Sequence, residues 1–375
     1  MTGTGFWRFR RERYRLSGVR CPHCGQPILA PRLFCTHCHH EIESVAQGVF
    51  PSVTGASLEP AKNSTVPITV LVPSYNAART IRGTLLALLA QDLDESYEII
   101  VVDSSSDETP QIIASEFPSV RLIHLDEQTD PGTARNLGIG QARGQVIACI
   151  DADCVAPTDW LRAMMTAQRA GHRVVGGPIE NGNPESLLAW AGYLSEFREW
   201  LPVGKAHLVT HIPTCNISYH RSVFEAFGGF PTEFYPQEDL LFHWWLSHHG
   251  VPIWFEPTVC VRHVHRSIWR SYVRHLRRIG RITARVLRLT GEEGAFLARS
   301  PVLASLTVPI LPLIKWLRTL DVFMNQQPHL LRRHPLALAP LLVGLYVWSL
   351  GFAEGAWAPA LNSSMREVPW QAEQS

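Results

Sequence analysis

The chain has 375 residues, 46% of them hydrophobic, and a formal net charge of +1 at pH 7. Because a chain of this length and apolar content can bury a large core, the composition excludes a single small domain and favours two or three structural units. The balanced charge hides two arginine-rich segments, within residues 1–20 and 262–288, which favour contact with phosphate groups. The first segment alternates aromatic residues with arginines, so it does not resemble a secretory signal.

Two Cys-x-x-Cys pairs near the N-terminus are formed by Cys21, Cys24, Cys35 and Cys38. Four thiolates at this spacing predict a structural Zn²⁺ site in a zinc ribbon at residues 21–43, although disulfides or an iron site could use the same spacing. Residues 44–66 are rich in Ser, Pro, Gly and Ala and are expected to form a linker. The other four cysteines lie in apolar or turn sequence, where we expect them to pack. A zinc ribbon with free thiols favours a cytoplasmic location.

Short apolar runs and helical patterns alternate after the linker. The expected strands are 68–72, 98–102, 121–125 and 146–150, with a helix at 77–92 after the first and another around Ile112 after the second. This order predicts a doubly wound α/β sheet, in which the polar residues that follow the strands gather at one edge. Those residues are Asn76, Asp103, Asp107, Asp151 and Asp153.

Asp151 and Asp153 directly follow the apolar run 146–150. Carboxylate oxygens at a strand end can hold a divalent metal that in turn binds a diphosphate. Since Asp-x-Asp is also common in solvated turns, the pair alone is weak evidence.

Six ordered segments resemble the family 2 glycosyltransferases, which have the GT-A fold. They are 70–76, 100–109, 132–144, 214–218, 227–231 and 237–239. The resemblance implies a GT-A type mixed sheet over residues 67–265 and the transfer of a sugar from a nucleotide-sugar, expected to be a UDP-sugar.

The resemblance also implies that seven residues contact the donor. Asp103 would accept hydrogen bonds from the base or ribose, and Arg135 would lie against the uracil or a phosphate. Taken singly, Asp103 and Asp107 fit a turn and a helix cap, and Arg135 fits a solvated helix. The seven residues are Pro73, Tyr75, Asn76, Asp103, Arg135, Asp151 and Asn216.

The matched acids imply a metal and a base. Asp153 would bind Mg²⁺ or Mn²⁺ directly, and Asp151 would face the ribose or reach the metal through water. His263 would be a third ligand, although a lone histidine is more often structural. Asp239 is the expected general base and Glu238 the second choice, whereas in isolation the two acids fit a helix N-terminus. The resemblance and a single base imply inversion, and a missing Gln-x-x-Arg-Trp motif implies transfer of one sugar to a hydroxyl acceptor, which could be lipid-linked.

Residues 266–375 mix basic and apolar patterns and predict a helical, membrane-associated region. The segment 267–288 fits a basic helix on anionic lipid or a solvated helix that closes the active site. The segment 335–353 lacks charge and is long enough for one tilted crossing or for a buried hairpin. Arg332 and Arg333 before it favour the cytoplasmic face of the membrane.

Two other functions fit part of this pattern. A zinc ribbon with arginine clusters fits a nucleic-acid-binding or protein-binding scaffold with a disabled transferase fold. However, every acid that sugar transfer needs is present, and the ribbon lacks interleaved aromatics for base stacking, so nucleic acid is not an expected partner. A nucleotidyltransferase also uses paired carboxylates and a metal, but it leaves residues 228–229 and 238–239 unexplained.

Overall fold

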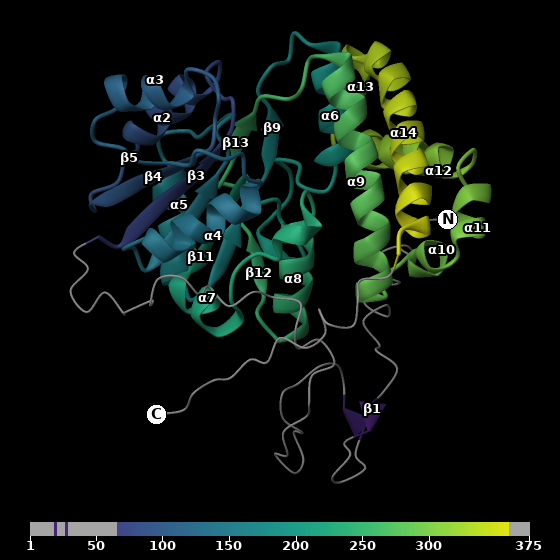
Figure 1. Cartoon of the computed structure of the whole chain (residues 1–375), viewed down its shortest axis with the longest axis horizontal. Coiled ribbons are helices and arrows are strands. Elements are labelled where there is room, and N and C mark those ends of the chain that lie inside the picture. Colours follow the sequence, from purple (N-terminus) through teal and green to yellow (C-terminus); the bar gives the residue numbers. More distant parts are fainter. Residues whose placement is uncertain (1–18, 21–26, 29–65, 360–375) are drawn as a thin grey trace.

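The computed structural model describes residues 19–20, 27–28 and 66–359. In the N-terminal region it describes two short strands, β1 (Val19–Arg20) and β2 (Pro27–Ile28), which pair in antiparallel orientation. The four cysteines of the predicted zinc site and residues 44–65 of the predicted linker lie outside the described residues. Residues 66–359 form two parts that lie side by side, a sheet covered by helices and a bundle of C-terminal helices (Figure 1).

Four parallel strands form the half of the large sheet that carries the predicted motifs. All seven residues of β3 are buried, as the continuous apolar run predicts for a central parallel strand. In order across the sheet, the strands are β6 (Val146–Ile150), β3 (Ile68–Ser74), β4 (Tyr97–Asp103) and β5 (Arg121–His124).

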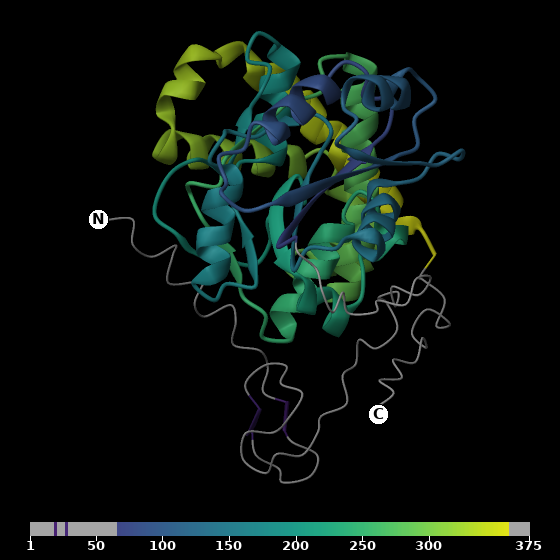
Figure 2. The same ribbon diagram turned by 90° about the vertical axis from the view of Figure 1, so that its left-hand side faces the viewer.

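Helices cover both faces of this half of the sheet (Figure 2). Because successive strand residues point to opposite faces, Val70 packs in one core with α2 (Ile81–Leu89) and α3 (Thr109–Glu116), and Leu71 packs in another with α4 (Pro131–Gln141). Helix α2 begins later than the expected residue 77, since residues 78–80 form a turn.

The other half makes the sheet mixed. Strand β11 (Asn216–His220) pairs in antiparallel orientation with β6, and three further strands extend the sheet beyond it. They are β8 (Val174–Gly176), β12 (Ile253–Phe255) and β10 (His207–Val209).

A separate three-stranded sheet starts directly after Asp153. It consists of β7 (Cys154–Val155), β13 (Val261–His263) and β9 (Ile179–Asn181), and its register places His263 opposite Cys154. Residues far apart in the sequence therefore meet beside the predicted metal motif. The remaining helices of this part are α5 (Trp160–Arg169), α6 (Leu187–Glu196), α7 (Arg221–Phe227), the 3₁₀ turn η1 (Thr232–Phe234) and α8 (Glu238–His248).

The C-terminal bundle is built on two long helices, α9 (Trp269–Thr290) and α14 (Leu338–Trp357), which pack along each other. Between them the chain forms α10 (Ala295–Arg299), α11 (Pro301–Leu306), α12 (Leu311–Gln326), α13 (Pro328–Arg333) and the 3₁₀ turn η2 (Pro335–Ala337).

Glycines let the backbones of α9 and α14 touch. A Cβ atom on Gly280 would lie 2.0 Å from the carbonyl oxygen of Trp348, and one on Gly351 would lie 2.0 Å from that of Arg277. No side chain fits at either position without a shift of the backbone. The pair of helices is therefore held at the closest spacing that glycine permits.

Within the described residues, Pro335–Trp357 is the one helix long and apolar enough to cross a membrane, judged by length and composition. Half of its most apolar stretch is buried inside the protein, because one side of α14 packs against α9. Of the two roles predicted for residues 335–353, packing in a core is the one that this contact favours.

Candidate active site

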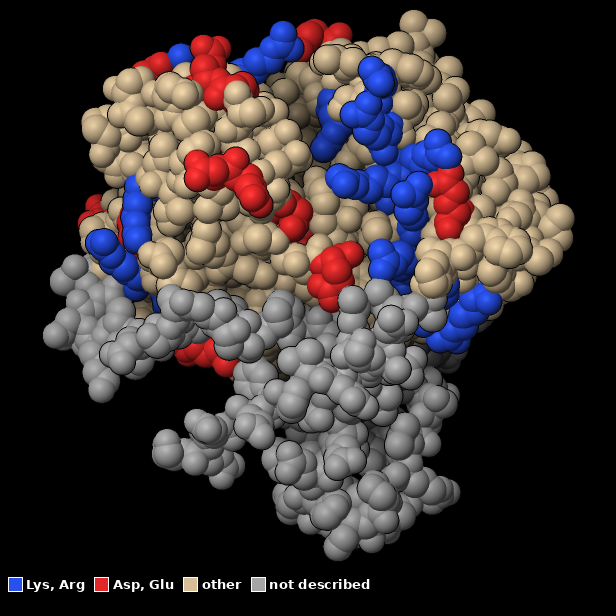
Figure 3. Space-filling view, viewed as in Figure 1, with Lys and Arg blue, Asp and Glu red and all other residues tan. Residues whose placement is uncertain are grey.

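A cleft of about 1060 Å³ separates the carboxyl edge of the sheet from the C-terminal bundle. Figure 3 shows the hollow between the two parts, with arginines gathered over α9 on one side. Nine of the predicted site residues line the cleft: Pro73, Tyr75, Asn76, Arg135, Asp151, Asp153, Glu238, Asp239 and His263. The two predicted acid pairs, one after β6 and one at the start of α8, therefore face one space.

Arg135 joins the two acid pairs. From α4, its guanidinium donates to Asp151 Oδ1 at 2.5 Å and to Glu238 Oε1 at 3.1 Å. Burial alone would lower the pKa of Arg135, but the charges of these two carboxylates raise it above its usual value. In this structure the guanidinium is engaged by protein carboxylates at the cleft wall, which makes it a link between the two motifs.

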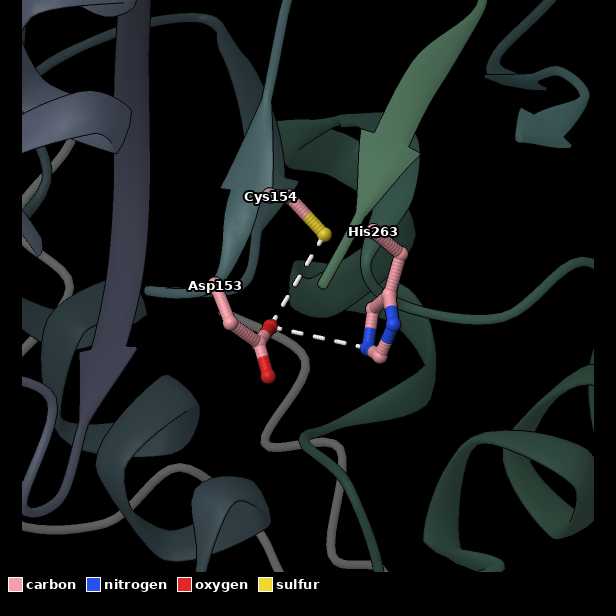
Figure 4. A group of neighbouring side chains, drawn as sticks. All are labelled: Asp153, Cys154 and His263. Carbon is pink, nitrogen blue, oxygen red and sulfur yellow. Dashed lines mark hydrogen bonds and ion pairs between the residues drawn. The ribbon is translucent and has the colours of Figure 1, made fainter. Parts of the chain in front are cut away.

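Asp153 and His263 lie against each other at the cleft (Figure 4). His263 Nε2 is 3.5 Å from Asp153 Oδ1, and Cys154 Sγ is 3.9 Å from the same oxygen. Each of the three side chains offers one potential ligand atom, and these atoms lie within 4.8 Å of one another, so the group could hold a metal ion. Burial raises the pKa of the Cys154 thiol well above its usual value, so it stays protonated and is a poor ligand.

The donor set at this point fits Mg²⁺ or Mn²⁺. A carboxylate oxygen suits either ion, and an imidazole nitrogen is compatible with Mn²⁺. Four of the carboxylates that line the cleft lie at the edge of the sheet, and within the part of the chain that the structure describes the buried arginine that contacts two of them is Arg135. A bound divalent cation would offset this excess of negative charge.

Asp239 lies in the first turn of α8, and its carboxylate accepts hydrogen bonds from neighbouring residues. Its Oδ2 atom accepts hydrogen bonds from the Thr214 backbone N at 3.1 Å and from the Thr214 hydroxyl at 3.3 Å, and His211 Nε2 lies 3.6 Å from Oδ1. Burial would raise the pKa of Asp239, but its interactions with the neighbouring His211 and with Arg135 outweigh burial and hold the pKa below its usual range. Asp239 is therefore ionised at neutral pH.

Glu238 differs from its neighbour. Its side chain is only 4% exposed, and burial together with the charge of Asp239 raises its pKa to about 8, against the opposing effect of Arg135. Two adjacent carboxylates rarely both ionise in a buried site, so the charge resides on Asp239, the one with more donors.

The side chains of Asp103 and Asn76 accept hydrogen bonds from the turn that follows β4 at the edge of the sheet. Asp103 is fully buried and accepts hydrogen bonds from the Ser105 hydroxyl at 2.6 Å and the Ser105 backbone N at 3.1 Å, with His124 Nδ1 at 2.9 Å. It is not among the residues that line the cleft. Asn76 has a left-handed φ of 49°, and its side-chain oxygen accepts a hydrogen bond from the Ser106 backbone N at 3.0 Å.

Asn216 is also buried away from the cleft. Its side-chain nitrogen donates to the carbonyl oxygens of Pro178 at 2.9 Å and Val259 at 2.7 Å, and its oxygen accepts from Trp160 Nε1 at 2.8 Å. The structure thus does not bring Asn216 to the predicted donor site. Its amide connects three segments of the fold instead.

Two site residues were not predicted from the sequence. His211 and Thr214 both hold Asp239, and they come from the loop between β10 and β11. Thr214 opens one of the six recognised segments, but His211 has no spacing to Asp239 that a motif would reveal. The four cysteines outside the predicted zinc site are free thiols, and three of them are buried, as expected.

The comparisons with known proteins agree with this geometry. Residues 69–228 match the model of glycosyl transferase family 2, and residues 10–42 match the ChsH2 rubredoxin-like zinc ribbon domain. The chain carries a family 2 glycosyltransferase domain behind a zinc ribbon.

Two relatives show the extent of the similarity. Glycosyltransferase AglE of Haloferax volcanii is 32% identical over 192 residues, which is 48% of this chain and 61% of AglE. Succinoglycan biosynthesis protein ExoO of Rhizobium meliloti is 42% identical over 118 residues, which is 31% of this chain and 34% of ExoO. The chain therefore matches less than two thirds of the length of either relative.

A similar fold occurs in GalNAc-T7, whose crystal structure with UDP, GalNAc and Mn²⁺ superposes with a TM-score of 0.50 at 14% identity. The match covers 65% of this chain and 51% of that one. Together with the family match, this likeness confirms the expected GT-A type mixed α/β sheet.

Proposed function

We propose that the chain transfers a single sugar from a nucleotide-sugar, expected to be a UDP-sugar, to a hydroxyl acceptor with inversion and with the help of a divalent metal. The observation that carries this proposal is that Asp153, His263 and Asp239 line one cleft, in a chain whose residues 69–228 match glycosyl transferase family 2. A disabled transferase fold would have no need to keep these groups in one space. The zinc ribbon is proposed to hold a structural Zn²⁺ through its four cysteines.

Asp153 and His263 would hold Mg²⁺ or Mn²⁺, with Asp151 behind them. When bound, such an ion supplies positive charge that stabilises a departing diphosphate. Arg135 keeps the Asp151 carboxylate in place by a buried ion pair of 2.5 Å. The nucleotide would lie toward Pro73, Tyr75 and Asn76, where the Tyr75 side chain is 44% exposed and free to stack on a base.

Asp239 would accept the proton of the acceptor hydroxyl. Its carboxylate is already ionised, and the hydrogen bonds from Thr214 fix its direction toward the cleft. Proton removal by one positioned base, with no second carboxylate acting as a nucleophile, favours direct displacement and hence inversion.

Metal-dependent donor binding tests the proposal. UDP together with Mn²⁺ should raise the melting temperature of the parent more than either does alone, because ligands that bind the native state stabilise it. Asp153→Asn should lose the contribution of Mn²⁺. Asp94→Asn, at an exposed position outside the cleft, is the matched control and should behave as the parent. An equal response of the parent and Asp153→Asn would contradict the assigned metal site.

We further propose that the bundle rests on the cytoplasmic face of a membrane. Large apolar side chains on α11, α12 and the turn between them are exposed, and the sequence carries no charge from residue 300 to residue 314. The exposed arginines of α9 would meet anionic head groups. The exposed apolar side chains are Val302, Leu303, Leu306, Ile310, Leu313, Ile314 and Leu317.

Vesicle co-sedimentation tests this location. The parent should bind vesicles that contain phosphatidylglycerol, and the double variant Leu306→Ser and Leu317→Ser should bind more weakly. The control carries Leu86→Ser and Leu208→Ser, which remove similarly exposed leucines, 61% and 59% exposed, from the other part of the molecule. Equal binding by both double variants would contradict a membrane contact through α11 and α12.

A further inference from the structure

The cleft continues past the carboxylates into the C-terminal bundle. Its far wall is formed by side chains of α9, α12 and α14, and half of them are apolar. This wall is distinct from the sheet edge that carries the predicted donor residues, since α12 and α14 lie beyond α9 when viewed from the sheet (Figure 1). The apolar side chains include Leu276, Ile279, Leu345 and Trp348.

One cation, Lys315 of α12, lies in this wall beside the apolar side chains. Its Nζ atom lies 4.0 Å from the ring centroid of Trp348, a cation–π contact. No carboxylate of the described residues lies within ion-pair distance of the Lys315 ammonium. Lysine is rare in this chain, which has only Lys62, Lys205 and Lys315 among its 34 basic residues.

The charged groups closest to Lys315 are mostly cationic. Arg198 and Arg318 lie nearby and share a single acid, Glu199, at 3.9 Å and 3.6 Å. Burial and these two arginines lower the pKa of Lys315 to about 7. The surroundings of Lys315 therefore have more positive than negative charge.

The nearest acid on α6 is already paired. Glu196 Oε2 lies 2.9 Å from His275 Nε2 of α9, and both side chains line the cleft. Because His275 satisfies this carboxylate, Glu196 does not serve as the partner of Lys315. A partly buried cation without a counter-ion is unfavourable unless an anion binds beside it.

We propose that Lys315 and Trp348 form an acceptor subsite that recognises the phosphate group of an amphiphile. The phosphate would bind the Lys315 ammonium, and the hydrocarbon would lie along Leu276, Ile279 and Leu345. Helix α12 carries Lys315 on its cleft side and exposed Leu313 and Leu317 on the outer surface. This inference rests on the proposed function and names the class of its acceptor.

Donor-free binding tests the subsite. Dodecyl phosphate and dodecyl maltoside, each below its critical micelle concentration, and inorganic phosphate are titrated into the full chain, with tryptophan fluorescence as the readout. The parent should prefer dodecyl phosphate over both others by about tenfold or more, since a charged hydrogen bond adds that much affinity. Lys315→Gln should lose this preference and Lys315→Arg should retain most of it. Lys205→Gln, which removes an exposed lysine outside the cleft, should keep it fully.

Three results would overturn the subsite. They are equal binding of dodecyl phosphate and dodecyl maltoside by the parent, equally tight binding of inorganic phosphate, and an unchanged preference in Lys315→Gln. UDP binding with Mn²⁺, measured on the same proteins, separates this failure from that of the proposed function. Normal UDP binding by Lys315→Gln supports an acceptor role, whereas its loss would place Lys315 on the donor side and overturn the inference. A parent that binds no UDP would contradict the proposed function and, with it, the naming of the ligand as an acceptor.

Discussion

The two walls of the cleft differ in the charge and polarity of their side chains. The sheet wall gathers four carboxylates around Arg135, so it has an excess of negative charge. The bundle wall combines apolar side chains with Lys315, which has no acidic partner among the described residues. One wall suits a cation and the other an anion attached to an apolar body. On the proposed assignments, the transferase chemistry would belong to the sheet and the choice of acceptor to the helices that follow it.

The largest expected effect concerns the sheet wall. Asp239→Asn should lower kcat by about 10²–10⁴-fold, because it removes a general base. Donor affinity should stay within about threefold of the parent, since the predicted donor residues lie elsewhere on the cleft. Single-turnover UDP release and UDP binding measured side by side give both numbers. The assignment fails if Asp239→Asn releases UDP at the parent rate in the presence of acceptor.

The carboxylates of the sheet wall show what a sequence can predict about a site. Asp151 and Asp153 follow a buried parallel strand, and chain direction alone places them at the ligand-binding edge. Asp103 follows a strand in the same way, yet Ser105 and His124 take up its hydrogen-bonding capacity. Such competition depends on side chains that meet only after folding, so strand position predicted where Asp103 lies but not which way it faces.

The bundle wall shows the opposite case. The sequence predicted a basic, apolar helical region, but it did not predict that α9 and α14 would pack side by side. That contact depends on Gly280 and Gly351, which lie in different helices separated by four others, and small residues carry no hydrophobic period that would reveal a partner. Lys315 was not singled out either, since the lack of a nearby acid is visible only in the folded chain.

The second prediction tests the packing of the bundle by comparing alanine substitutions at two helical glycines, one in the contact between α9 and α14 and one outside it. Gly280→Ala should destabilise the protein by about 1–3 kcal/mol, because the new methyl group would overlap the Trp348 carbonyl and the two helices must separate. Gly83→Ala, where the nearest atom to a Cβ would be 4.0 Å away, should be neutral or stabilise by up to about 1 kcal/mol through helix propensity. Urea denaturation of both variants measures the contrast. A destabilisation of similar size at both positions would show that the close contact between α9 and α14 is not rigid.

The third prediction uses pH to examine the lone cation of the bundle wall. The pKa of Lys315 is lowered to about 7, so between about pH 7 and the usual lysine pKa the unfolded chain binds more protons than the folded one. Because of this difference, the free energy of unfolding rises with pH across that range. Below pH 7 Lys315 is charged in the folded protein, and the full cost of burying that charge destabilises the fold. Lys315→Met should therefore stabilise the ligand-free protein by roughly 1–2 kcal/mol at pH 6 and by less at pH 9. Melting temperatures at the two pH values measure the effect, and a stabilisation that grows with pH would contradict it.

The smallest expected effect concerns a cluster of ion pairs between α9 and α14. Glu354 of α14 bonds Arg277 and lies 2.7 Å from Arg281, both on α9, and the hydrogen bond from Arg277 lowers the pKa of Glu354. A lowered carboxylate pKa contributes stability above the unfolded pKa, and that stability is lost as the pH falls through the folded value. Because these side chains are largely exposed, Glu354→Gln should cost only about 0.3–1 kcal/mol at pH 7, and less in 1 M salt. Urea denaturation at low and high salt checks this. A loss as large as that of Gly280→Ala would mean that ion pairs, and not the glycine contact, hold α9 and α14 together.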